Sequence, residues 1–278
     1  MSHEAVIVDD RSRHAYRSGF WTPTKGVRLP AEHGDLTSRC SAVRLIGPPG
    51  LTFSGETAVL LWDGVEACDE CIEFTIPGTA HPKRRSGIRA RRRDLMAADV
   101  TEVKGLPVTT PARTFADVAE RLALPSLVAV GDDFLRRGLC ARPELAAALT
   151  RGEGQRGIRK ARRALDLLDP RSESPRESIT RAIIIEAGLP APTPQVNIYD
   201  RFGRFIARGD LVYEEARVVI EYDGFHHLTL EGQRKDARRR GELGIEGWLI
   251  VTIVPADVHR PRDLVAKVSR ALASRDGL

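Results

Sequence analysis

The spacing of apolar residues in the last third of the chain predicts an ordered series of helices and strands. Ser174, Pro175 and Glu177 are typical of a helix start, because serine caps the first turn and proline suits the first helical position. Short apolar runs then predict strands, and apolar residues three or four positions apart predict further helices. After the first helix, which ends at Gly188, we expect strands at 195–199, 205–213 and 217–222, a helix at 231–246, a strand at 248–254, and a final helix that carries Leu264, Val265, Val268 and Leu272 and is capped by Asp257 or Asp263.

The first half of the chain has shorter and less regular patterns, which predict a mixed α+β fold. Helices are expected at 35–46, 54–62, 110–123, 125–137 and 142–150, and strands at 71–76 and 87–92. At 278 residues the chain is long enough for two domains. We therefore expect an irregular segment at 1–25, an α+β domain at 26–150, a basic helix and linker at 151–173, and an α/β domain at 174–278.

Three acidic residues are predicted at the ends of two neighbouring strands. Glu221 and Asp223 follow an apolar stem and share one face, because alternate strand residues point the same way. Asp210 lies towards the end of the preceding strand. Acids this close repel each other unless a cation lies between them, and hard divalent cations such as Mg²⁺ or Mn²⁺ prefer oxygen ligands. The pattern predicts Asp210, Glu221 and Asp223 as metal ligands, although isolated strand-end acids are usually only solvated.

The element order and these acids resemble the PD-(D/E)XK nuclease superfamily, and within it the very-short-patch-repair-like endonuclease domain. The matching residues of 174–278 are Ser174, Pro175 and Glu177, then Asp210, then Glu221, Asp223, Gly224 and His227, then Asp236 and Arg239, then Gly247 and Trp248. The resemblance implies a restriction-endonuclease-like αβββαβα core and metal-dependent hydrolysis of phosphodiester bonds in DNA.

The same resemblance implies roles for the site residues. Asp210 and Glu221 would bind the metal ion, His227 would act near the scissile phosphate, and Glu177 would reach in from the first helix. A carboxylate-bound divalent ion can activate water and relieve phosphoryl charge, and a histidine can move a proton. Glu177 has an equally good interpretation as the acid of a helix cap.

One position departs from the superfamily, whose lysine two residues after the second acid is Asp223 in this chain. Either Asp223 is a further ligand, or the role of the lysine falls to His226, His227 or Lys235. Adjacent histidines on extended backbone face different ways, so we expect only one of the two in the site, and the resemblance favours His227.

The stretch 103–114 resembles the region upstream of such nuclease modules in AbiEi-type antitoxin-like proteins. Those relatives begin with a winged helix-turn-helix, which the first 25 residues are too short and irregular to form. The alternative function is a non-catalytic DNA-binding regulator related to AbiEi-type antitoxins. The missing lysine favours this alternative, whereas the retained acids and His227 favour the enzyme.

Two dense basic clusters predict contact with nucleic acid. Residues 81–93 contain seven Lys or Arg and no acid, and residues 151–163 contain six with one acid, in a chain of net charge +5 and pI about 9.2. Such clusters neutralise phosphates without choosing a sequence, and nothing here distinguishes DNA from RNA. The candidate contacts, including two on the helix at 231–246, are Lys83, Arg84, Arg85, Arg91, Arg92, Arg93, Arg159, Lys160, Lys235 and Arg239.

The remaining composition predicts a cytoplasmic protein with no membrane partner. No run of about 18 apolar residues is present, and the first residues do not have the pattern of a signal peptide. Four cysteines are too few to cross-link a chain of this size, so we expect reduced thiols. The sequence leaves open the oligomeric state, the substrate, the function of the first domain, and the choice among DNA repair, defence and a toxin–antitoxin context.

Overall fold

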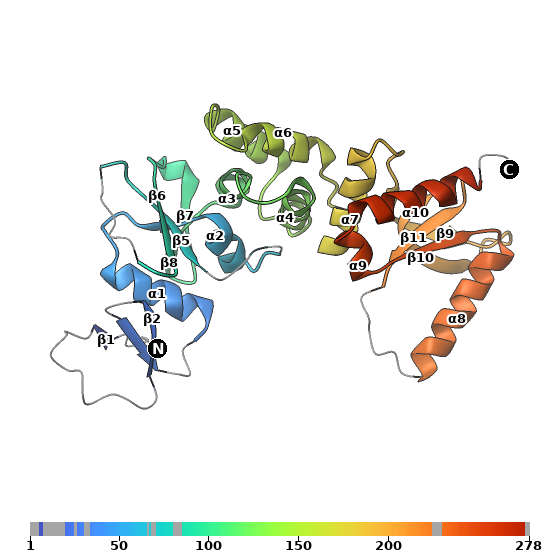
Figure 1. Ribbon diagram of the computed structural model, residues 1–278, viewed down its shortest axis with the longest axis horizontal. Helices are drawn as coiled ribbons and strands as arrows, with labels where there is room; N and C mark the ends of the chain where they lie inside the picture. The colour runs from blue at the N-terminus through green and yellow to red at the C-terminus, as the bar shows by residue number, and fades with distance from the viewer. Residues whose placement is uncertain are drawn as a thin grey trace. The chain divides into compact units, whose positions relative to one another are not determined.

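The computed structural model describes residues 6–7, 20–24, 27–30, 34–65, 67, 71–79, 85–223 and 230–275, which form two compact units (Figure 1). The first unit contains Met1–Leu122 and Gly138–Arg162, and the second contains Ala123–Arg137 and Arg163–Leu278. The division after Arg162 lies inside the predicted linker at 151–173, whereas Ala123–Arg137, from the predicted first domain, belongs to the second unit. Among the described residues, no helix has both the length and the apolar character needed to cross a bilayer.

The first unit is built on a five-stranded mixed sheet with the strand order β6-β5-β4-β8-β7. Its strands are β4 (Thr52–Phe53), β5 (Ile72–Ile76), β6 (Ile88–Arg92), β7 (Val100–Val103) and β8 (Leu106–Thr109). A smaller sheet has the order β1-β3-β2, with β1 (Val6–Ile7), β2 (Phe20–Thr24) and β3 (Val27–Pro30). The apolar core contains Phe53, Leu61, Phe74 and Val108.

Most predicted helices of this half are confirmed within two residues. The helices are α1 (Leu36–Ile46), α2 (Gly55–Leu61), α3 (Pro111–Val118), α4 (Leu124–Arg136), α5 (Arg142–Arg151) and α6 (Ile158–Leu167), with a short 3₁₀ turn at Ala97–Asp99. Asp35 caps α1 by accepting the N–H of Ser38 at 3.1 Å. Helix α3 ends five residues before the predicted end, and the sequence patterns missed β4, β7, β8 and the small sheet, whose strands are short.

Besides α4, the second unit contains the elements that the sequence predicts, in the predicted order, with one extra short helix. Its elements are α7 (Pro175–Glu186), β9 (Thr193–Tyr199), β10 (Phe205–Tyr213), β11 (Val218–Tyr222), α8 (Leu230–Ile245), β12 (Leu249–Ile253), α9 (Pro255–Val258) and α10 (Pro261–Ala273). Ser174 caps α7 by accepting the N–H of Glu177, as predicted. The four-stranded sheet has the order β12-β11-β10-β9, in which only β11 and β12 are parallel. A mixed α/β unit is therefore confirmed, whereas a restriction-endonuclease-like core stays a prediction.

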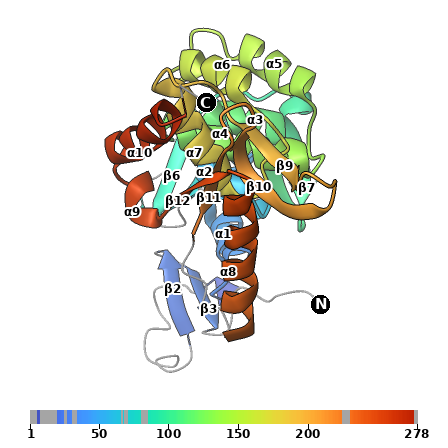
Figure 2. The same ribbon diagram turned by 90° about the vertical axis from the view of Figure 1, so that its right-hand side faces the viewer.

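Helices cover both faces of this sheet (Figures 1 and 2). On one face, Leu211, Ile220 and Ile253 pack with residues of α4, α7 and α10. On the other face, Val212 and Val219 pack with Leu243 of α8. The alternation of side chains along β10 and β11 thus supplies two cores, and the sheet is held rigidly at the point where the acids emerge.

Helix α4 is tied to α7 by a buried ion pair. The Arg181 guanidinium donates to Asp132 at 2.7 Å and to the carbonyl oxygen of Leu167 at 2.6 Å. Asp132 also accepts the N–H of Asp169 at 2.6 Å. These contacts bring a helix from the first half of the sequence into the second unit, an arrangement that no local sequence pattern predicts.

Candidate functional site

Three of the predicted acids come together in the second unit from three different elements. Glu177 lies in the first turn of α7, Asp210 on β10 and Glu221 on β11. The antiparallel register pairs Leu211 with Ile220, so the next residues outward, Asp210 and Glu221, lie side by side. Asp210 Oδ2 accepts the N–H of Tyr222 at 3.2 Å. The expected positions of Asp210 and Glu221 at neighbouring strands agree with this register, whereas their role as a site stays a prediction.

The acids act on one another electrostatically. Burial is the largest cause that raises the pKa of Asp210 to about 6, and the negative charges of Glu177 and Glu221 raise it further. The N–H of Tyr222 and the charge of Arg239 oppose this shift. The pKa of Asp210 is thus close to neutrality, and the cluster favours any added positive charge.

Gln195 is a site residue that the sequence interpretation missed. Its Nε2 donates to Glu177 Oε2 at 2.8 Å, and the register of β9 with β10 places it beside Asp210. Its backbone has φ 55°, a left-handed conformation that is rare for residues other than glycine and is often found at functional sites. The same Glu177 oxygen accepts the N–H of Glu173 at 2.9 Å, so Glu177 also serves the helix start.

Arg239 is the cation that faces the acids. Its Nη1 and Nη2 donate to the two oxygens of Glu221, the second at 3.0 Å, and Nη2 also donates to Asp236 at 2.7 Å. The hydrogen bond to Glu221 is the largest cause that raises the pKa of Arg239. The sequence interpretation placed Arg239 on DNA and looked for the missing cation at His226, His227 or Lys235. Both histidines lie outside the described residues.

The described acids alone do not fit a complete divalent metal site. No group of three or more His, Cys, Asp or Glu side chains within the described ranges is arranged to hold an ion. Asp223 lies beyond the end of β11 and is exposed, and its N–H donates to the carbonyl of Ile253 at 2.8 Å. Both oxygens of Glu221 are bound by Arg239, so an ion at Asp210 and Glu221 requires the guanidinium to move. The metal ligands and Mg²⁺ or Mn²⁺ stay predictions.

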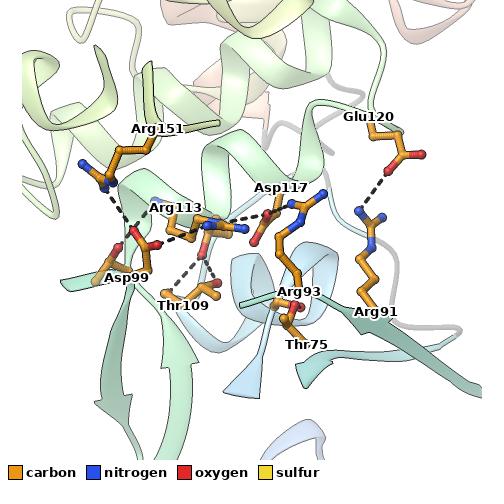
Figure 3. Close-up of polar contacts among 12 residues, drawn as sticks. Thr75, Arg91, Arg93, Asp99, Thr109, Arg113, Asp117, Glu120 and Arg151 are labelled. Carbon is orange, nitrogen blue, oxygen red and sulfur yellow. Dashed lines mark hydrogen bonds and ion pairs between the residues drawn. The ribbon is translucent and has the colours of Figure 1, made fainter. Parts of the chain in front are cut away.

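The basic residues of β6 and the residue that follows it mostly contact acids of their own unit (Figure 3). Arg91 on β6 donates to Glu120 at 3.0 Å, and Arg93, directly after β6, donates to Asp117 at 2.9 Å. Asp117 also accepts from Arg113 at 3.0 Å, and burial raises its pKa.

The other candidate contacts with nucleic acid fall into three groups. Arg92 on β6 is exposed, and Arg159 on α6 is exposed as well. Lys160 donates to the carbonyl of Leu122 at 2.7 Å. Lys83 and Arg84 lie outside the described residues, whereas Arg85 and Lys235 each have an interaction within the protein. Among the candidate contacts in the two basic clusters, Arg92 and Arg159 are therefore the best placed to meet nucleic acid.

Comparisons with known proteins identify a matching domain family and two similar proteins. Residues 65–170 match the AbiEi antitoxin C-terminal domain, which includes the stretch 103–114 that suggested this resemblance. The match ends before α7, so it does not bear on the acids. No solved structure matches the chain.

Two similar proteins come from Mycobacterium tuberculosis, namely "Uncharacterized protein MT2308" of strain CDC 1551 / Oshkosh and "Uncharacterized protein Rv2248" of strain ATCC 25618 / H37Rv. Each is 36% identical to this chain over 245 residues, which cover 87% of this chain and 89% of the relative. The chain therefore belongs to the same family as these two mycobacterial proteins, and its residues 65–170 match the AbiEi antitoxin C-terminal domain.

Proposed function

We propose that this protein is a DNA-binding regulator related to AbiEi-type antitoxins. The match of residues 65–170 to the AbiEi antitoxin C-terminal domain is the observation that carries this proposal. The net charge of +5 and the exposed Arg92 and Arg159 support contact with phosphates. The bond between Arg239 and Glu221 also supports a non-catalytic role, since it neutralises one acid of the cluster.

A gel-shift and reporter experiment tests the regulator. The full chain should shift the DNA upstream of its own gene at a lower concentration than an unrelated fragment of equal length, and it should repress a reporter behind that DNA. Arg92→Ala and Arg159→Ala should weaken binding to both fragments alike, because phosphate contacts carry no sequence information. Equal affinity of the parent for both fragments, together with an unchanged reporter, would contradict the proposal.

A second candidate function is a metal-dependent DNA endonuclease, favoured by the electrostatic coupling of Glu177, Asp210 and Glu221. Neighbouring carboxylates repel one another, and a divalent cation is the natural partner of such a cluster. Asp210 and Glu221 would hold Mg²⁺ or Mn²⁺, which when bound supplies an activated water and neutralises phosphoryl charge. Glu177, held by Gln195, would add negative charge to the cluster from α7, and Arg239 would have to release Glu221 first.

Plasmid cleavage tests the second candidate. The parent should nick supercoiled DNA with Mn²⁺ or Mg²⁺ and not with a chelator, and Asp210→Asn should lose this activity with an unchanged circular dichroism spectrum. A parallel reaction with single-stranded RNA separates a DNase from an RNase. If the parent binds plasmid but leaves it intact at every metal concentration, the endonuclease is refuted and the regulator alone remains.

A further inference from the structure

Several large apolar side chains at the turn between β9 and β10 are exposed to solvent. Among the described residues six large apolar side chains are exposed, and Tyr199, Phe202, Phe205 and Ile245 lie at this turn or at the facing end of α8. Phe202 is 77% exposed. The rings of Tyr199 and Phe205 meet edge to face with centroids 6.0 Å apart. Single exposed apolar residues are ordinary, but a contiguous group of rings marks an interaction site.

A pocket of about 340 Å³ lies next to these rings, and Phe205, Ile206 and Ile245 form part of its lining. We call Tyr199, Phe202, Arg204, Phe205 and Ile245 the aromatic surface. It belongs to the second unit alone.

Three arginine side chains around this surface are each more exposed than the acid with which they pair. The Arg204 side chain is 79% exposed, whereas its partner Asp200, at 2.7 Å, is 8% exposed. The pairs Arg201–Glu246 and Arg238–Glu242 have the same arrangement, with the arginine more exposed than the acid. The formal charges of the three pairs cancel, but in each pair the guanidinium ion is the more exposed group. The charged groups that extend furthest into solvent beside the rings are therefore guanidinium ions, which are complementary to phosphate.

The turn holds Phe202 and Arg204 in fixed positions. Asp200 Oδ1 accepts the N–H groups of Phe202 and Arg204, both at 2.8 Å, and Gly203 takes the left-handed conformation at φ 79° that closes the turn. The Arg204 guanidinium lies 5.8 Å from the centre of the Phe202 ring. Because the backbone of the turn is already held by these hydrogen bonds, it loses little freedom when a ligand binds to the ring.

We propose that the aromatic surface binds unpaired bases of single-stranded nucleic acid by stacking, while the outer arginines meet the phosphates. Bases stack on aromatic faces and on guanidinium planes in proteins that bind single strands without strong sequence choice. Duplex DNA offers no free base faces, so the surface selects single strands. This inference deepens the proposed DNA-binding function and rests on it.

The position of the surface relates it to the acids. Phe205 and Asp210 lie on the same strand, five residues apart, which spans roughly 17 Å at the usual rise of a strand. A few nucleotides of an extended strand cover such a distance. The aromatic surface and the cluster of Asp210 and Glu221 are therefore within reach of one bound single strand.

Fluorescence anisotropy with labelled oligothymidylate tests the proposal, with the full chain in a chelator so that nothing is cleaved. Phe202→Ala and Phe205→Ala should each weaken binding at least about fivefold, since one lost stack has an effect of that order, and leave the salt dependence unchanged. Phe202→Trp should retain or improve binding. Met96→Ala, which removes an exposed apolar side chain of the first unit, is the matched control and should change nothing.

Three further measurements make the result decisive. Ultraviolet cross-linking of oligothymidylate should attach bases to residues 199–205, and a cross-link elsewhere would overturn the proposal. Unchanged single-strand binding by the Phe202/Phe205 double alanine variant would also overturn it. If sedimentation shows a dimeric parent and a monomeric double variant with equal affinity for the oligonucleotide, the surface is a contact between copies of this chain instead.

The outcomes also separate this inference from the regulator. If the aromatic surface stacks bases but the protein shows no preference for the upstream DNA, the inference is supported and the regulator is contradicted. If the protein prefers the upstream duplex and the alanine variants have no effect, the regulator is supported and the inference is contradicted.

Discussion

Replacing Asp210 by asparagine should stabilise the second unit at neutral pH. The acid has a pKa of about 6, against 3.8 for an ordinary aspartate, because burial and the charges of Glu177 and Glu221 disfavour its ionised form. Two pKa units correspond to about 3 kcal/mol at most. Since the side chain is partly exposed and screened, we expect a gain of about 1–2 kcal/mol. Asparagine keeps an oxygen that can accept the N–H of Tyr222.

The pH dependence of this gain has a definite sign. Above about pH 6 the acid is ionised in the folded and the unfolded protein, so the folded state of the parent carries the whole penalty. Between pH 6 and 3.8 the folded parent takes up the proton before the unfolded chain does, and the parent becomes more stable relative to the variant. The advantage of Asp210→Asn should therefore be full at neutral pH and absent below pH 3.8.

Hydrogen exchange of the amides in Val218–Tyr222 measures the stability difference between the parent and Asp210→Asn, because these core amides report opening of the second unit alone. Asp200→Asn is the matched control. The pKa of Asp200 is lowered, chiefly by the hydrogen bond from the N–H of Arg204, so removing its charge should reduce stability instead of increasing it. Equal protection of parent and Asp210→Asn at neutral pH, or a difference that grows as the pH falls, would refute the raised pKa of Asp210.

Three other substitutions test separate parts of the structure. Arg181→Met should destabilise the second unit by about 3–5 kcal/mol in urea unfolding, because it leaves Asp132 charged and buried, whereas the double change with Asp132→Leu should recover much of the loss. Arg239→Ala should raise Mn²⁺ affinity, measured by electron paramagnetic resonance, because the guanidinium no longer competes for its glutamate; an unchanged or lower affinity would contradict the acid site as a metal site. Gly157→Ala should lower the melting temperature of the first unit more than Gly154→Ala, since both have positive φ but only the first would place a Cβ 2.6 Å from backbone atoms; equal losses would show that conformation alone matters.

Local patterns in the sequence determined most elements of the second unit. The Ser174 cap, the apolar runs and the turn residues at 200–203 act over a few positions, so they specify a helix, a strand or a turn wherever the chain is placed. The sequence also placed Asp210 and Glu221 on neighbouring strands, and the hairpin register of the structure then sets them side by side. The short strands β4, β7 and β8 carry too few residues for a period to be recognised, and they exist because the sheet pairs them.

Tertiary structure alone decided what surrounds the acids. Asp223 was expected on the face of Glu221, but β11 ends at Tyr222 and the N–H of Asp223 bonds to the parallel strand β12. Gln195 and Arg239 reach Glu177 and Glu221 across 18 residues of sequence in each case, through sheet register and the docking of α8. Helix α4 leaves its neighbours in sequence to pack on α7, because burying its apolar face and the Asp132–Arg181 pair there is favourable. Such contacts depend on which distant segments pack into the same core. A periodic pattern of apolar residues predicts a helix or a strand, but it does not say which other segment that element packs against.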